Sequence, residues 1–154
     1  MLHVLHLLRP VVDEGGTRGR EEVEVEALGE DRYRVLCPPR FVYALAVGDE
    51  IKTDASSAGF RTLRRSRNLT VWIYVEDANG VLAVAEAAES VAASIGATIE
   101  GTPPKRIIIT VPLSAGWQKN EVAINALCSS VPGVSWEYAN VFDSVTHEPL
   151  NWWK

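Results

Sequence analysis

A regular alternation of predicted strands and helices over residues 70–154 constrains the fold more than any other feature. Residues 80–95 carry apolar side chains at i, i+3 and i+4 over four turns, and Gly96 follows where a helix C-cap is expected. This spacing predicts an amphipathic helix with one face against a sheet. The side chains predicted to face that sheet include Val84, Ala88 and Val91.

A second helix is predicted over residues 117–130, where Pro132 and Gly133 end it. Its inward side chains are predicted to be Val122, Ala126 and Leu127. Short β-rich segments surround the two helices, at 70–75, 97–100, 106–111 and 134–141. The order β-α-β-β-α-β is typical of a ferredoxin-like unit, in which two helices cover one face of a four-stranded antiparallel sheet.

The first half of the chain has the signature of short strands. Residues 21–28 alternate charged and apolar side chains, a turn follows at 29–31, and 32–36 continues as the hairpin partner. Further strands are predicted at 50–53 and 60–65. The pattern indicates a small antiparallel β-barrel or a curled sheet. Loops are predicted at 13–20 and 102–104.

The chain is therefore expected to be an α+β protein with a β-rich unit over residues 1–69. A ferredoxin-like unit with a C-terminal tail is expected over residues 70–154.

Residues 24–53 carry a family resemblance. The stretches EVEALGEDRYRVL (24–36) and PRFVYALAVGDEIK (39–52) resemble a family of short, uncharacterised bacterial proteins with a domain of unknown function. That family joins a strand-rich N-terminal part to a ferredoxin-like part. The resemblance implies a bacterial origin, and it brings no catalytic residue, cofactor or substrate.

The distribution of charge bears on the class of partner. The net charge is −5, with 11 basic and 11 acidic residues in 1–70 but 4 basic and 9 acidic in 71–154. A nucleic-acid-binding domain usually carries the opposite sign, so nucleic acid is not an expected partner. No apolar run approaches the roughly 20 residues of a membrane span. A cytoplasmic protein without membrane contact is expected.

The sequence carries none of the usual catalytic signatures. It has no phosphate-binding Gly-rich loop with a following Lys, no nucleophile elbow and no HExxH motif. His3 and His6 are three apart in a predicted strand, so they point to opposite faces and cannot share a metal ion. We therefore expect no catalytic residues, no metal site and no cofactor, and a protein that is not an enzyme.

Four arginines lie within seven residues, at Arg61, Arg64, Arg65 and Arg67. One interpretation is a solvated edge strand, where charges discourage pairing with another sheet. The other is a site for an anion or an acidic partner, since Arg binds carboxylates and phosphates with two parallel hydrogen bonds.

Aromatic residues form the second candidate surface. Trp72 and Tyr74 share one side of the strand at 70–75, and Trp136 and Tyr138 share one side of the last strand. If the β-branched residues face the helices, these four rings are expected together on the open face of the sheet. Bare rings are costly, so we predict that this face is buried against residues 1–70 or against a second copy in a homodimer.

Three functional hypotheses follow. The first is a non-catalytic protein-interaction module, for example an immunity-type protein that blocks a toxin by charge complementarity. The second is a regulatory domain that senses a small ligand at a dimer seam. The third is an enzyme whose site is dispersed over both halves, which would require convergent polar residues in one pocket.

Overall fold

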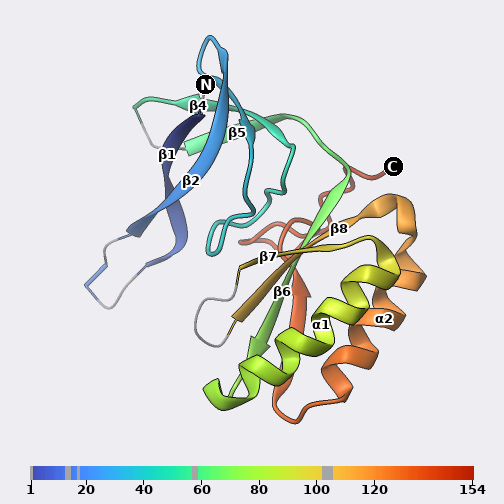
Figure 1. The fold of residues 1–154 in the computed structure, drawn as a ribbon. Coiled ribbons are helices and arrows are strands. Elements are labelled where there is room, and N and C mark those ends of the chain that lie inside the picture. Colours follow the sequence, from blue (N-terminus) through green and yellow to red (C-terminus); the bar gives the residue numbers. More distant parts are fainter. Residues whose placement is uncertain (1, 13–14, 17, 57–58, 102–105) are drawn as a thin grey trace. The chain divides into compact units, whose positions relative to one another are not determined.

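The computed structural model describes residues 2–12, 15–16, 18–56, 59–101 and 106–154. Contacts divide the chain into two units, one formed by Met1–Ser66 with Asn140–Lys154 and the other by Arg67–Ala139 (Figure 1). The loop predicted at 102–104 lies outside the described residues, as do positions 13, 14 and 17 of the loop predicted at 13–20.

The first unit contains a five-stranded antiparallel sheet in the order β1-β2-β3-β4-β5. Its strands are β1 (Leu2–Val12), β2 (Arg18–Gly29), β3 (Arg32–Val35), β4 (Glu50–Asp54) and β5 (Gly59–Arg64). No ladder joins β1 to β5, so the sheet is not a closed barrel. Of the two predicted alternatives the barrel is wrong, and the open, curled sheet is what the strands form (Figure 1).

One face of this sheet forms the core of the first unit. The alternation in β2 turns Val23 and Val25 to the inside, where they meet Val35 and Ile51 from the neighbouring strands. The apolar stretch 41–47 forms no strand, but its Val42 and Leu45 are buried in the same core. The opposite face of the sheet, called here the outer face, carries the charged residues of the alternating pattern.

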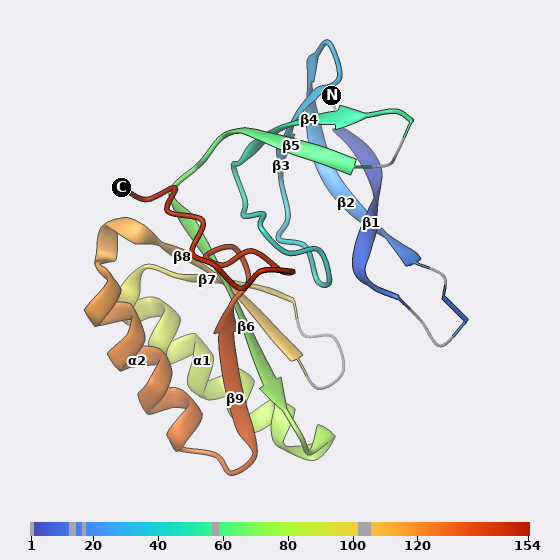
Figure 2. The same ribbon diagram turned by 180° about the vertical axis from the view of Figure 1, so that it is seen from behind.

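The second unit has the predicted element order. Its strands are β6 (Asn68–Val75), β7 (Thr98–Gly101), β8 (Arg106–Pro112) and β9 (Val134–Tyr138), and its helices are α1 (Val81–Ile95) and α2 (Trp117–Ser129). Short 3-10 turns, η1 (Ala78–Gly80) and η2 (Leu113–Ala115), precede the helices. The sheet order is β7-β8-β6-β9 with antiparallel neighbours, and both helices lie on one face (Figures 1 and 2).

The inward faces of the helices were predicted only in part. In α1, Val84 and Ala88 are buried and Gly96 adopts the left-handed C-cap (φ 70°), as expected, but Val91 is only half-buried. In α2, Val122 is 63% exposed and Ala126 is also exposed, so the prediction was wrong for both. The buried residues of α2 are Asn120, Ile124 and Leu127. The apolar residues of α2 are spread around the helix, so several rotations of the helix satisfy the pattern.

The C-terminal segment groups with the first unit rather than with the strand that precedes it. The indole N–H of Trp152 donates to the carbonyl of Asn140 (2.7 Å), and the guanidinium of Arg65 lies 5.7 Å from the centre of the Trp152 ring. The predicted division at 69/70 placed this segment in the second unit. The contacts of a terminal segment without helix or strand produce no periodic pattern in the sequence, so the sequence did not predict them.

Candidate functional site

The four clustered arginines have different surroundings. Arg65 is a structural residue, because its guanidinium donates to the carbonyl of Ala44 (2.5 Å) and to the carboxylate of Asp49 (3.2 Å). Its side chain is only 19% exposed and that of Asp49 only 1%. A buried, bonded ion pair of this kind is not available to a partner.

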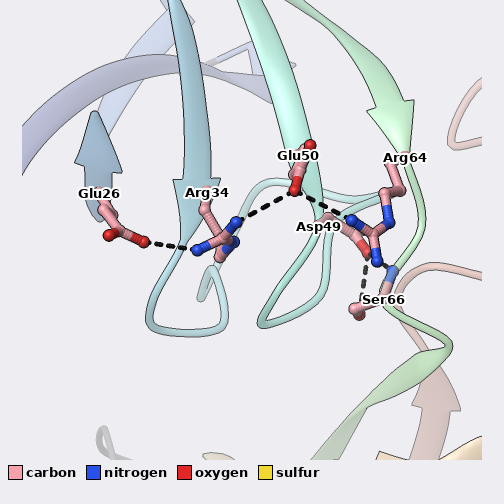
Figure 3. Close-up of polar contacts among 6 residues, drawn as sticks. All are labelled: Glu26, Arg34, Asp49, Glu50, Arg64 and Ser66. Carbon is pink, nitrogen blue, oxygen red and sulfur yellow. Dashed lines mark hydrogen bonds and ion pairs between the residues drawn. The ribbon is translucent and has the colours of Figure 1, made fainter. Parts of the chain in front are cut away.

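Asp49 connects the loop before β4 to the segment after β5. Its carboxylate accepts from the backbone N–H of Ala46 (3.0 Å), and from both the N–H (2.8 Å) and the hydroxyl (3.0 Å) of Ser66 (Figure 3). Burial raises the pKa of Asp49, while the bonds from Ser66 and the charge of Arg65 act in the opposite direction. The turn at Val47 and Gly48 is thus held by the buried carboxylate that follows it.

Arg64 belongs to a line of alternating charges on the outer face. Arg34 on β3 donates to Glu26 on β2 (2.7 Å) and to Glu50 on β4 (3.2 Å), and Arg64 on β5 donates to the same oxygen of Glu50 (3.5 Å) (Figure 3). Arg64 therefore already forms an ion pair with a carboxylate of this chain.

Arg67 and Arg61 differ from the other two in that neither forms an ion pair with a described residue. Arg67 has a left-handed backbone (φ 66°), belongs to the second unit, and accepts from Leu113 through its carbonyl (3.0 Å). Arg61 is exposed on the outer face of β5, in the first unit. The compact arginine cluster read from the sequence is not a single site.

Arg61 instead joins two basic residues that are distant in sequence. Arg32 on β3 lies directly opposite Lys52 on β4, and Lys52 lies directly opposite Arg61 on β5. Residues directly opposite in an antiparallel pair share a face with their Cβ atoms about 4.5–5.5 Å apart. All three side chains are exposed. They form a line of positive charge across three neighbouring strands, called here the cationic row.

The cationic row has no ion-pair partner in the described part of the chain. Within it, none of the three side chains takes part in an ion pair, and the Nε of Arg32 reaches only the carbonyl of Gly29 (3.4 Å). Like charges directly opposite in a sheet are destabilising. The row therefore costs the fold some stability, in contrast to the paired charges of Arg34 and Arg64.

A shallow hollow of about 560 Å³ borders the row, next to the turn between β2 and β3. Its lining comprises Asp31, Lys52, Thr53, Asp54, Ala55, Gly59, Phe60 and Arg61. Two of these residues, Lys52 and Arg61, belong to the row, and the carboxylates of Asp31 and Asp54 line the same hollow without forming an ion pair with them.

The same outer face carries a line of acidic residues along β2. Glu22, Glu24 and Glu26 are two residues apart and point to the same side. Glu22 lies 3.9 Å from a ring nitrogen of His6, and Glu24 accepts from the thiol of Cys37 (3.3 Å). We call these three residues the acidic stripe.

The aromatic residues of the second unit divide between the two faces of its sheet. On the face away from the helices, the guanidinium of Arg106 lies 5.0 Å from the ring centre of Trp72 and 4.8 Å from that of Tyr74. The hydroxyl of Tyr74 donates to Glu137 (2.5 Å). Trp72 is 1% exposed and Tyr74 is half-buried.

Trp136 and Tyr138 lie on the other face, which corrects the prediction that they join Trp72 and Tyr74. In the register of β6 with β9, Trp136 is opposite Ile73 and Tyr138 is opposite Val71, so both rings turn to the helices. The indole N–H of Trp136 donates to Asn125 on α2 (2.8 Å). For Trp72 and Tyr74, on the opposite face, the predicted burial in an interface stays a prediction.

Tyr138 occupies the centre of this helix-facing group. Its ring packs edge-on against Trp117 (5.3 Å) and Trp136 (4.9 Å). Burial and then the nearby carboxylate of Glu121 raise the pKa of Tyr138, although the hydroxyl has no hydrogen bond of ordinary geometry. Close edge-to-face packing fills the space between the rings, so these aromatics are core residues rather than a ligand site.

No other feature of the described residues points to chemistry. They contain no group of three or more His, Cys, Asp or Glu side chains placed to hold a metal ion. None of their helices has the length and apolar character needed to cross a membrane. Burial raises the pKa of Cys128 to about 11, which makes this thiol a poor nucleophile at neutral pH.

Residues 21–129 match the family model described as Domain of unknown function (DUF4265), so the chain belongs to that family. The match spans both units and agrees with the resemblance seen over residues 24–53. No curated protein matches the sequence.

The fold is also similar to a solved structure, described as that of a hypothetical protein from Neisseria gonorrhoeae. The TM-score is 0.66, the sequence identity 15%, and the alignment covers 90% of this chain and 94% of the other. At this identity the likeness concerns the fold alone.

Proposed function

We propose that this chain is a non-catalytic protein-interaction module that binds an acidic protein segment through the outer face of its first sheet. The observation that supports this is the cationic row, where Arg32, Lys52 and Arg61 lie side by side and none of them forms an ion pair with a described residue. An arrangement that weakens the free fold is retained more readily when a bound partner supplies the missing negative charge.

The size of the row favours a protein partner over nucleic acid. Two strand spacings of about 4.8 Å give a row roughly 10 Å long, enough for a few carboxylates of a peptide. Nucleic-acid binding needs a longer continuous basic surface. The chain carries a net charge of −5, and the acidic stripe on the same face would repel a phosphate backbone.

We also infer that the second unit is a ferredoxin-like unit. Its order β7-β8-β6-β9, with antiparallel neighbours and two helices on one face, supports this assignment. A ferredoxin-like fold does not specify a function, so the proposed role rests on the surface of the first unit.

The test is a titration of the full chain into fluorescently labelled poly-L-glutamate, followed by anisotropy at low salt. Replacing Arg32, Lys52 and Arg61 together with Gln should weaken binding about tenfold, since three exposed charge contacts contribute roughly 0.5 kcal/mol each. Arg64→Gln is the control, because it removes one positive charge from the same sheet at a residue already paired with Glu50. It should change the affinity by less than about twofold.

Two results would contradict the proposal. Equal affinity of the wild type and the triple variant would show that the cationic row is not the binding surface. Tighter, salt-sensitive binding to random RNA than to polyglutamate would favour a nucleic-acid partner instead.

A further inference from the structure

We propose that the acidic partner of the cationic row is a second copy of this chain. This deepens and rests on the proposed function, and it is carried by the charges of a single face. The outer face of the first sheet holds both the cationic row and the acidic stripe, so it is complementary in charge to itself. An isologous two-fold interface requires this property, because each patch must meet its complement on an identical surface.

The two patches match in direction as well as in charge. The cationic row runs across β3, β4 and β5, perpendicular to the strands, whereas the acidic stripe runs along β2. Crossing two outer faces at about 90° therefore lays the row of one copy along the stripe of the other. Their lengths are similar, roughly 10 Å for the row and about 13 Å from Glu22 to Glu26.

One symmetry axis makes both contacts at once. The row starts one strand beyond β2 and lies about two residues past Glu26 along the strands, on the side away from Glu22. With this offset, a two-fold axis in the plane of the interface and diagonal to the strands places each row over the partner copy's stripe. The repulsion within the row is then relieved by carboxylates from outside.

Other charges on this face leave the two patches available. Arg34 pairs with Glu26 and Glu50, and Arg64 pairs with Glu50, so this line of four charges adds no net charge to the contact. The stripe carboxylates that remain are Glu22 and Glu24. In the described residues the close polar contacts of the Glu22 and Glu24 carboxylates are with His6 and Cys37, and neither carboxylate forms an ion pair with an arginine or a lysine. An interface held by exposed charges is expected to be weak and strongly dependent on salt.

Charge exchange tests the inference directly. A reversed-row variant carries Lys52→Glu and Arg61→Glu, and a reversed-stripe variant carries Glu22→Lys and Glu24→Lys. Sedimentation velocity should show a dimer for the wild type at about 0.05 M salt and a monomer at about 1 M salt. Each variant alone should be monomeric at both, since two of the three charges in one patch now repel the patch that they face.

An equimolar mixture of the two variants should restore the dimer, because every contact between them is attractive again. Formation of that heterodimer also shows that both variants are folded. A monomeric wild type at low salt, or a mixture that stays monomeric while both variants keep the wild-type circular dichroism spectrum, would overturn the inference. If the wild type is monomeric but still binds polyglutamate through the row, the self-association is refuted and the proposed function stands.

Discussion

Removal of the Asp49 carboxylate is the sharpest test of how the first unit is held together. The variant Asp49→Ala leaves the guanidinium of Arg65 mostly buried without its counter-charge, and it deprives the N–H groups of Ala46 and Ser66 of their acceptor. Breaking a buried ion pair by deleting one partner costs about 3–5 kcal/mol. The unbonded N–H groups belong to the same network, so their cost is partly contained in that figure.

We therefore expect the free energy of unfolding to fall by about 4 kcal/mol, a large part of the 5–15 kcal/mol typical of a natural protein. At roughly 2–4 °C per kcal/mol for a chain of this size, the melting temperature should drop by about 8–16 °C. Urea unfolding and a thermal melt measure these two quantities. Asp49→Asn keeps one acceptor oxygen and should lose less.

The matched control is Glu148→Ala, which removes one exposed carboxylate from the same unit and should change stability by less than about 0.5 kcal/mol. A free energy of unfolding for Asp49→Ala within about 1 kcal/mol of the wild-type value would contradict this prediction. The ion pair between Asp49 and Arg65 would then add little to the free energy of unfolding, because water would solvate Arg65 equally well in the variant.

Three further predictions follow from the described contacts. Ala88→Asp should cost about 3–5 kcal/mol in urea unfolding, because it places an unpaired charge on the buried face of α1; an unchanged midpoint would contradict that burial. In a Cys37→Ser background, Cys128 should react with iodoacetamide about a hundredfold more slowly at pH 8 than a free thiol, since burial shifts its pKa from 9.0 to about 11 and only the thiolate reacts. Its rate should rise with pH up to about 11, and a plateau near pH 9 would refute the shift. Lys52→Gln should raise the melting temperature by a degree or two, because it relieves repulsion within the cationic row, and a lower melting temperature would show that Lys52 has a stabilising contact.

Local pattern was sufficient for most of the secondary structure. The apolar spacing and the glycine after it predicted α1 to within a turn, and alternation of charged and apolar residues predicted β2 and the hairpin to β3. These signals work because helix and strand periods differ, and because caps and turns use few residue types. For α2 the extent was predicted, but Val122 and Ala126 were assigned to the wrong side. Its apolar residues are spread around the helix, so they do not show which side faces the sheet.

The composition of the candidate site could not be read from spacing along the chain. Four arginines close in sequence have different surroundings, and Arg61, which has no ion pair among the described residues, lies beside Lys52 because β4 pairs with β5. Arg32 and Lys52 were missed because neither forms a motif. The available signal was their alternation within predicted strands, and it becomes a row only when the register is known.

The sequence by itself determined the α+β class, the element order of the second unit and the absence of recognisable catalytic motifs, because these depend on residue type and local period. Only the tertiary structure decided which side chains share a face. Trp136 turned to the helices because its position lies opposite Ile73, and a shift of one residue in the register would have reversed it. The pairing of strands depends on contacts between segments that are distant in sequence, because the register must bury the whole core. It therefore cannot be predicted from the sequence of one segment.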